Sequence, residues 1–179
     1  MNSSYKKNNF DNIIKCMTFL NKPKTIVEFG ILDGYSLDSF IENSDKECQI
    51  YACDIFEDFI GNGSEYNVIM GKYKNIDNVH IGKCDFYQEY KNIKDDSVDI
   101  LHVDIANDGT TYDFCINNYY NKIRKNGFIL LEGGSKDRDN VEWMLKYDKK
   151  PIAEYLEKIK DKYEIMTIDT YPSMTIVKK

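Results

Sequence analysis

Four acidic residues follow short apolar stretches of this sequence, at the places where β-strands are expected to end: Glu28, Asp54, Asp104 and Glu132. In a parallel α/β sheet, the carboxyl ends of the strands line the crevice in which ligands bind. Carboxylates there can accept hydrogen bonds from sugar hydroxyls or an amine, or take a proton from a substrate. The sequence therefore predicts a ligand crevice surrounded by acids.

The segment Thr25–Phe40 reads as a strand, a glycine-containing turn and the start of a helix. Without a Cβ, Gly30 would let a ligand lie against the backbone, and Gly34 would let the helix begin close to that ligand. Helix N-termini offer unpaired N–H groups, and Glu28 offers a carboxylate for a ribose hydroxyl or an ammonium. The turn suits a nucleoside with a zwitterionic head more than a pyrophosphate, because Leu32 interrupts the dinucleotide fingerprint G-x-G-x-x-G.

Two further acids are candidates for holding a nucleoside. Asp54 ends the second expected strand, where related folds bind ribose hydroxyls, although a solvated strand-end Asp would look the same in isolation. The neighbouring Ile55 and Phe56 could flank an adenine ring. Asp85, after the third expected strand, could accept a hydrogen bond from the exocyclic amine of adenine.

The acceptor side of a reaction would use acids from later strands. Asp104 and Asp108 are the leading candidates for a base, followed by Tyr112 and Glu132. Asp104 is equally suited to hold an amino group of the bound ligand, and Glu132 could instead orient the substrate or the 133–135 loop. An exposed Asp has a pKa of about 4 and is a weak base, so burial would have to raise it. His102 and His80 are expected to be packed neighbours.

The elements that would position these residues follow from hydrophobic periodicity and turn residues. We expect strands at 25–29, 49–53, 79–83, 97–103 and 127–131, and helices at 5–21, 35–43, 66–73, 87–91 and from Thr110 or Thr111 to Arg124, with two more separated by Pro151. The last two β-rich runs are joined by too few residues for a helical crossover, so they should pair as an antiparallel hairpin. The predicted fold is α/β: a mostly parallel seven-stranded sheet, a C-terminal antiparallel hairpin, and helices on both faces.

The bulk properties predict one domain over 1–179. The net charge of −6 and the mixed charge pattern argue against nucleic acid as a partner, and no apolar run is long enough to span a membrane. Segment 1–22 is expected to be a helix packed on the sheet edge, or alternatively a lid, and segment 57–78 an insertion near the substrate. Without a secretory signal the protein is expected to be cytoplasmic, with its five cysteines reduced: Cys16, Cys48, Cys53, Cys84 and Cys115.

Over essentially its full length the chain resembles the class I S-adenosylmethionine-dependent methyltransferases. Within them it is similar to the small methyltransferase-24 or macrocin O-methyltransferase-like branch, through "VEFGILDGYS" and "LHVDIANDGTTYDF". The matching residues are 28–34 for the first motif, Asp54 for the ribose-binding acid, 84–86 for the adenine side and Asp104 for the fourth motif. The resemblance implies a Rossmann-like methyltransferase sandwich.

The resemblance also implies S-adenosyl-L-methionine as cofactor and S-adenosyl-L-homocysteine as product. The expected cofactor-binding residues are Glu28, Gly30, Ile31, Gly34, Tyr35, Ser36, Asp54, Ile55, Phe56, Cys84, Asp85, Phe86 and Asp104. We predict no metal, because Glu132-Gly133 stands where the related metal-dependent members carry an Asp-Asp or Asp-Asn pair, although Asp104, Asp108 and Glu132 could gather around a hard cation.

Three functions are consistent with these residues. The first is O-methylation of a small molecule or of a sugar or glycan precursor, such as a phosphorylated capsule or lipopolysaccharide building block. The second is a catalytically idle adenosylmethionine-binding subunit that supports a partner enzyme, and the third, an oxidoreductase, is weakened by the missing glycine and the terminal hairpin. A homodimer through the N-terminal helix or the 57–78 insertion is also considered.

Overall fold

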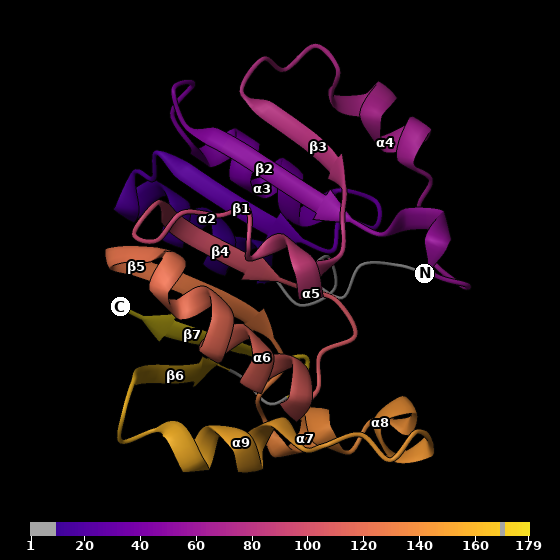
Figure 1. The fold of residues 1–179 in the computed structure, drawn as a ribbon, viewed down its shortest axis with the longest axis vertical. Coiled ribbons are helices and arrows are strands. Elements are labelled where there is room, and N and C mark those ends of the chain that lie inside the picture. The colour runs from indigo at the N-terminus through magenta and orange to yellow at the C-terminus, as the bar shows by residue number, and fades with distance from the viewer. Residues whose placement is uncertain (1–9, 169–170) are drawn as a thin grey trace. The chain divides into compact units, whose positions relative to one another are not determined.

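The structure is a computed structural model that describes residues 10–168 and 171–179 (Figure 1). Its seven strands form one sheet in the order β3-β2-β1-β4-β5-β7-β6. The chain divides into two compact units, Met1–Asn92 and Ile93–Lys179, which are described in turn. The predicted α/β class and mostly parallel sheet are confirmed, whereas the single domain over 1–179 stays a prediction.

The first unit alternates helices with three parallel strands. Its described elements are α2 (Phe10–Asn21), β1 (Thr25–Phe29), α3 (Tyr35–Asn43), β2 (Gln49–Asp54), η1 (Phe56–Asp58), α4 (Tyr66–Tyr73), β3 (Val79–Lys83) and α5 (Phe86–Glu89). Strand β2 pairs in parallel with β1 on one side and with β3 on the other. In this register Cys53 lies beside Phe29 and beside Gly82, so the carboxyl ends of the three strands lie together.

The helices of this unit cover the strands with apolar faces. Phe10, Ile14 and Thr18 form the buried stripe of α2, at the four-residue spacing of one helix face. Helix α2 packs against α3, whose Leu37 and Phe40 are fully buried. The expected N-terminal helix is therefore a packed helix over its described part, and its first residues lie outside the described part of the chain.

The second unit contains two parallel strands and the C-terminal hairpin. Its described elements are β4 (Val98–Val103), α6 (Gly109–Tyr119), η2 (Tyr120–Lys122), β5 (Ile123–Glu132), α7 (Lys136–Asp139), α8 (Glu142–Lys146), α9 (Ile152–Ile159), β6 (Glu164–Ile168) and β7 (Met174–Lys178). Strand β7 pairs antiparallel with both β5 and β6 and lies between them (Figure 1). The predicted hairpin is confirmed, although Thr170 of its connection lies outside the described residues.

The helix predicted to reach Arg124 ends earlier than expected. Helix α6 stops at Tyr119, a 3-10 turn covers Tyr120–Lys122, and β5 already begins at Ile123. The reason is tertiary, because Ile123 pairs with Val98 of β4 and its side chain is fully buried. Strand pairing therefore outweighs the local helical pattern.

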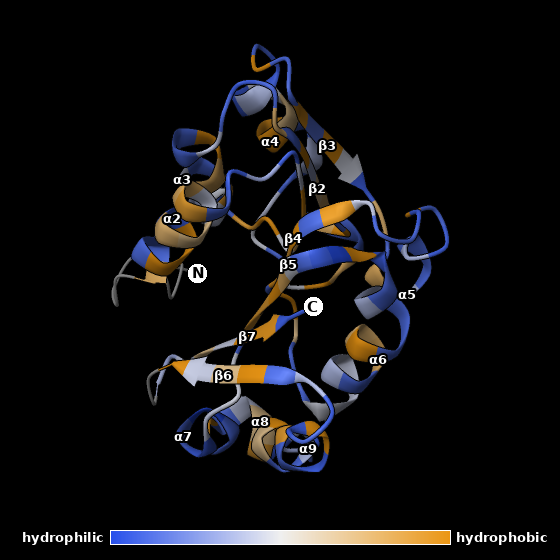
Figure 2. Ribbon diagram, turned by 90° about the vertical axis from the view of Figure 1, so that its left-hand side faces the viewer, coloured by the Kyte–Doolittle hydropathy of each residue, from blue (hydrophilic) through white to orange (hydrophobic). Residues whose placement is uncertain are grey.

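Pro151 separates α8 from α9, as predicted, and stands at the N-cap of α9. Helix α9 shows both hydrophobic and hydrophilic colour in Figure 2, and its apolar Ile152 and Leu156 are buried. It packs on α6, whose Tyr112 and Tyr119 are fully enclosed. His102 is buried within β4, which supports the structural reading of this residue.

Candidate functional site

The glycine turn after β1 is fastened to the end of β2. Gly30 has a φ of 91°, in the left-handed region that favours glycine. Its N–H donates to the carbonyl of Cys53 at 2.9 Å, and the next N–H, that of Ile31, donates to Oδ2 of Asp54 at 2.7 Å. The strand-to-helix turn that the sequence predicts is therefore present and is held in place by the strand beside it.

Asp54 is the centre of this arrangement. Its Oδ1 accepts hydrogen bonds from the N–H of Phe56 at 2.7 Å and from Nδ2 of Asn62 at 2.9 Å. The residue is 9% exposed. Because a carboxylate offers about four lone-pair sites, the three short hydrogen bonds leave little capacity for a ligand. Asp54 joins the glycine turn to η1, a structural role that the sequence did not reveal, and Asn62 carried no signal of its own.

Position 34 requires a glycine, because the side chain of Tyr73 fills the space that a Cβ there would take. A Cβ at Gly34 would lie 2.0 Å from the hydroxyl oxygen of Tyr73, and the residue has a φ of 82°. That hydroxyl oxygen lies 3.0 Å from the carbonyl oxygen of Gly34 and 2.8 Å from Oδ1 of Asp38, so its one proton is shared between these two acceptors. Burial raises the pKa of Tyr73, and its hydrogen bond to Asp38 adds to the effect. The missing Cβ, which we expected to bring the helix close to a ligand, here admits a side chain from α4.

Glu28 and Ser36 form a buried pair between β1 and α3. Glu28 is fully buried at the end of β1, and the Ser36 hydroxyl donates to its Oε1 at 2.5 Å. Tyr35, at the start of α3, is half-buried, and its N–H donates to the carboxylate of Asp33. The expected first-motif residues are thus gathered in one strand-to-helix connection.

Only part of the predicted adenine side reaches the surface. Phe86 is buried and packs edge-on against Phe29, with ring centroids 5.2 Å apart. Phe56 is also fully buried, so it offers no exposed surface to an adenine ring in this structure, and its place beside adenine stays a prediction. Ile55 is 37% exposed, and the exposed Asp85 caps α5 by accepting from the N–H of Tyr87 at 2.8 Å.

Two of the cysteines expected to be reduced form a disulfide. Cys53, in β2, is bonded to Cys84, the residue after β3, with their Cα atoms 5.6 Å apart. The other cysteines are free: Cys16 is exposed, and Cys48 and Cys115 are buried. The expectation of five reduced thiols is therefore wrong for this pair, because the parallel register of β2 and β3 brings together residues separated by 31 positions.

On the second unit, Asp108 caps a helix. Its Oδ1 accepts from the N–H groups of Thr110 and Thr111, both at 2.9 Å, at the N-terminus of α6. Its Oδ2 lies 3.6 Å from Nζ of Lys149. The cap is thus Asp108, and not Thr110 or Thr111 as the sequence suggested. Both oxygens of this predicted base have partners within the protein.

Glu132 is bound by Arg138, a residue for which the sequence predicted no role. Arg138 donates from Nε to Oε1 of Glu132 at 2.6 Å and from Nη2 to Oε2 at 2.7 Å, and only 5% of Arg138 is exposed. Burial alone would lower the pKa of Arg138, but the hydrogen bonds and charge of Glu132 raise it above its ordinary value. One signal was available, because Arg138 is one of two arginines in a lysine-rich sequence.

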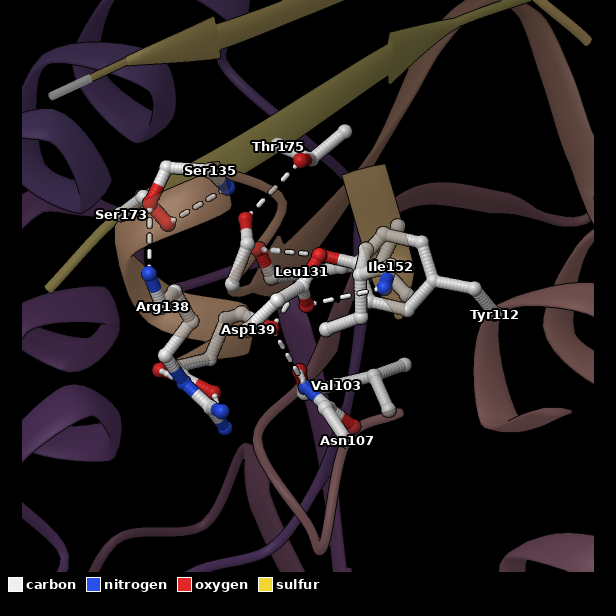
Figure 3. Close-up of polar contacts among 12 residues, drawn as sticks. Val103, Asn107, Tyr112, Leu131, Ser135, Arg138, Asp139, Ile152, Ser173 and Thr175 are labelled. Atoms are coloured by element: carbon white, nitrogen blue, oxygen red, sulfur yellow. Dashed lines mark hydrogen bonds and ion pairs between the residues drawn. The ribbon is translucent and has the colours of Figure 1, made fainter. Parts of the chain in front are cut away.

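Tyr112 and Asn107 bind the backbone around Glu132 (Figure 3). The Tyr112 hydroxyl is fully buried and donates to the carbonyl of Glu132 at 3.1 Å. Nδ2 of Asn107 donates to the carbonyls of Val103 and Glu132, each at 2.9 Å, so it clamps the ends of β4 and β5. Burial raises the pKa of Tyr112 well above its usual value. These contacts are structural.

Asp104 stands directly after β4 and is half-buried. Its negative charge contributes to the raised pKa of Arg138, after the larger effects of burial and Glu132. Asp104, like Asp108, Tyr112 and Glu132, interacts with other residues of the protein, and its catalytic role stays a prediction.

Within residues 10–168 and 171–179, no group of three or more His, Cys, Asp or Glu side chains is arranged to hold a metal ion. None of the helices in these described residues is long and apolar enough to span a membrane.

A parallel sheet with an inserted antiparallel last strand and a glycine turn after β1 defines the Rossmann-like methyltransferase class of fold. The family model described as "Methyltransferase domain" matches residues 27–132. The chain belongs to this family of methyltransferase domains. The match includes the glycine turn, Asp54 and the segment that follows β4.

Solved structures share the fold at low sequence identity. A Bacillus cereus O-methyltransferase in complex with S-adenosylhomocysteine (SAH) has 13% identity and a TM-score of 0.67, over 96% of this chain and 81% of that chain. A SAH-bound Podospora anserina methyltransferase has 17% identity and a TM-score of 0.66, over 99% and 79%. The Streptomyces achromogenes O-methyltransferase TomG, of tomaymycin synthesis, in complex with S-adenosylmethionine (SAM), has 11% identity and a TM-score of 0.65, over 95% and 79%. No curated protein matches the chain in sequence.

Proposed function

We propose that this methyltransferase domain transfers a methyl group from S-adenosyl-L-methionine to an oxygen atom of a small molecule. The observation that carries the proposal is the glycine turn of β1, which Asp54 fastens to the end of β2 through the N–H of Ile31. This is the connection at which α/β folds bind nucleosides. The similar solved structures with SAM or SAH bound support the choice of cofactor, and the O-methyltransferases among them support oxygen as the acceptor atom.

We propose that residues at the strand ends of the first unit bind the adenosyl group. Asp85 is exposed, and we propose that its carboxylate accepts from the exocyclic amine of adenine. Ile55, 37% exposed, offers apolar surface to the ring. Asp54 already accepts from four donors, so a ribose hydroxyl would take the place of the longest of these hydrogen bonds, that from the N–H of Leu32 to Oδ2 at 3.4 Å, and Gly30 presents backbone without a side chain. We assign these four residues to cofactor binding.

The cofactor supplies a methyl group that is already activated on a sulfonium. The protein then has to align the acceptor oxygen with the methyl carbon and to exclude water. A hydroxyl acceptor must also lose its proton, which a carboxylate within hydrogen-bonding reach assists. We assign this role to Asp104, because it stands directly after β4, at the carboxyl end of a parallel strand, and is half-buried.

The acceptor class that we propose is a sugar-derived or other small metabolite, including phosphorylated glycan precursors. It rests on the resemblance of the segments around Gly30 and Asp104 to the macrocin O-methyltransferase-like branch. We further propose a cytoplasmic enzyme without a nucleic-acid partner, in keeping with the net charge of −6. A homodimer stays a prediction.

Isothermal titration calorimetry with SAH tests the cofactor assignment. We expect saturable binding with a Kd between about 1 μM and 1 mM, the range of typical enzyme KM values. Asp85→Ala should weaken binding. Asp95→Asn, which removes one end of an exposed ion pair with Lys122, is the matched control and should bind normally. Absence of heat at about 1 mM SAH would reject the proposal.

Turnover tests the acceptor side. The purified enzyme, SAM and a panel of sugar nucleotides, sugar phosphates and phenolic or aliphatic alcohols are incubated, and SAH formation is measured. Asp104→Asn should lower kcat while leaving the SAH affinity within about threefold, because a transition-state interaction is lost rather than ground-state binding.

One observation favours a second function, that of a catalytically idle SAM-binding subunit. Asp108, Tyr112 and Glu132, three of the four predicted catalytic residues, have structural partners in this unit. A subunit of this kind would bind SAH, show no turnover on any acceptor and co-purify with another protein. Turnover by the isolated chain excludes it.

A further inference from the structure

The disulfide between Cys53 and Cys84 lies among the residues assigned to the cofactor. Cys53 immediately precedes Asp54, and Cys84 immediately precedes Asp85. The bond between the two sulfur atoms therefore connects the residue before Asp54, which we assign to the ribose, to the residue before Asp85, which we assign to the adenine. Both cysteine residues are half-buried, so neither is fully enclosed by the protein. The buried Cys48 and Cys115 are protected from such reagents.

Hydrogen bonds join the same two residues to the glycine turn. The carbonyl of Cys53 accepts from the N–H of Gly30 at 2.9 Å, and the N–H of Cys84 donates to the carbonyl of Asp54 at 3.0 Å. The side chain of Asp54 in turn accepts from the N–H of Ile31 at 2.7 Å. A covalent bond between Cys53 and Cys84 thus limits the relative movement of β1, β2 and β3 at the ends that carry the cofactor ligands.

We propose that Cys53 and Cys84 are a reversible thiol-oxidation site, and that the disulfide form binds S-adenosyl ligands more tightly than the dithiol form. The inference rests on the proposed function and adds to it a dependence on redox state. The cause is preorganisation, because a crosslink that is already in place reduces the ordering that ligand binding would otherwise require. The Cα separation of 5.6 Å is within the range that disulfides span without backbone movement.

The oxidation needs a low-molecular-weight disulfide, such as oxidised glutathione, as the electron acceptor. The thiolate of one cysteine attacks a sulfur of that disulfide, forming a mixed disulfide and releasing one glutathione thiolate. The thiolate of the second cysteine attacks the protein sulfur of the mixed disulfide, forming the Cys53–Cys84 bond and releasing the second glutathione thiolate. The two thiol protons are taken up by the two released thiolates, and two electrons pass to glutathione.

The experiment uses the full chain carrying Cys16→Ser, which removes the exposed free thiol and its intermolecular crosslinks. One sample is equilibrated with oxidised glutathione and one with a phosphine reductant. Alkylation followed by peptide mass analysis reports the bond, and calorimetry with SAH reports the affinity. We expect Cys53 and Cys84 to be protected from alkylation only after oxidation, and the Kd to rise by about three- to tenfold on reduction, a change equivalent to ordering one or two side chains.

Two variants make the result specific. Cys53→Ser/Cys84→Ser should bind SAH as the reduced protein does and should not respond to either reagent. The protein that retains Cys16 should show the same dependence of SAH affinity on redox state, once disulfide-linked dimers have been removed by gel filtration. A thermal unfolding scan of each sample without ligand shows that the double variant is folded.

The outcomes separate this inference from the proposed function. Full alkylation of Cys53 and Cys84 after oxidation overturns the oxidation site. An equal SAH affinity in the two forms, or a higher affinity in the reduced form, overturns the preorganisation while leaving the proposed function in place. No SAH binding in either form overturns the proposed function and the redox effect on binding together, whatever the alkylation pattern.

Discussion

The guanidinium of Arg138 donates to both carboxylate oxygens of Glu132, from Nε at 2.6 Å and from Nη2 at 2.7 Å, and both side chains are almost fully buried. The pair joins the end of β5 to α7. Its geometry is the bidentate arrangement that makes arginine–carboxylate hydrogen bonds strong and directional. A strand-end acid that could have served in catalysis is therefore a fixed element of the second unit.

Removing one member of this pair should be costly. Arg138→Met leaves a buried carboxylate without its cation, so we expect a loss of about 3–5 kcal/mol in the free energy of unfolding, measured with urea. Arg138→Met/Glu132→Leu should recover most of that loss, because no buried charge remains. Arg124→Met, which breaks a more exposed pair with Asp99, should cost about 1 kcal/mol or less. Equal losses for the two arginines would contradict the buried-pair interpretation.

Substitutions of Asp108 distinguish a role as helix cap from a role as catalytic base. Asn caps helices about as well as Asp, so Asp108→Asn should keep the free energy of unfolding within about 0.5 kcal/mol, whereas Asp108→Ala should lose about 1–2 kcal/mol. If Asp108 is only a cap, Asp108→Asn also keeps kcat, measured as SAH formation. A kcat lowered more than about 100-fold with unchanged stability would instead identify Asp108 as the base.

Gly34 should not tolerate a side chain. Gly34→Ala places a Cβ 2.0 Å from the Tyr73 hydroxyl oxygen and forces alanine into a φ of 82°, so we expect a loss of more than about 2 kcal/mol in the free energy of unfolding. Adding Tyr73→Phe should recover part of the loss by removing the clashing oxygen. Gly71→Ala, in α4 where a Cβ meets open space, is the control and should stabilise by about 0.5–1 kcal/mol.

Glu57 should contribute a pH-dependent stabilisation. Hydrogen bonds from its own backbone, from Lys83 and from the N–H of Tyr66 lower the pKa of Glu57 from 4.5 to about 2. Because the folded-state pKa is lowered, the stabilisation is fully present above pH 4.5 and is lost as the pH falls from 4.5 toward about 2.

Glu57→Gln isolates this contribution. The urea midpoints of wild type and variant should differ above pH 5 and converge between about pH 4 and pH 2.5, since the wild-type carboxylate gains its proton in that interval. A difference for Glu57→Gln that does not vary with pH would rule out the carboxylate as the cause.

Much of the fold could be predicted because local pattern and tertiary structure agree. The strands at 25–29 and 79–83 and the helices at 35–43 and 66–73 have the predicted bounds, since apolar runs there are flanked by turn residues. The start of β5 at Ile123 could not be predicted in this way. Its pairing with Val98 depends on a partner 25 residues earlier, which a local pattern does not contain.

The candidate site was predictable as a set of strand ends, and less so as individual roles. Spacing placed Gly30 and Asp54 correctly at the carboxyl ends of β1 and β2. The role of each acid depends on a partner from another part of the chain. Asp54 accepts from Asn62 and Glu132 from Arg138, and no rule of sequence spacing predicts these pairs. The Cys53–Cys84 bond was missed for the same reason, because it follows from the register of two strands.

Strand β7 lies between β5 and β6, so the edge strand β6 reaches the sheet only through β7. The hairpin must therefore be inserted as a pair, or β7 must dock first. A substitution that disrupts β7 (Met174–Lys178) removes its backbone hydrogen bonds to both β5 and β6. The edge of β5 would then be open to pairing with another chain. We therefore expect such variants to aggregate, and not only to lose activity.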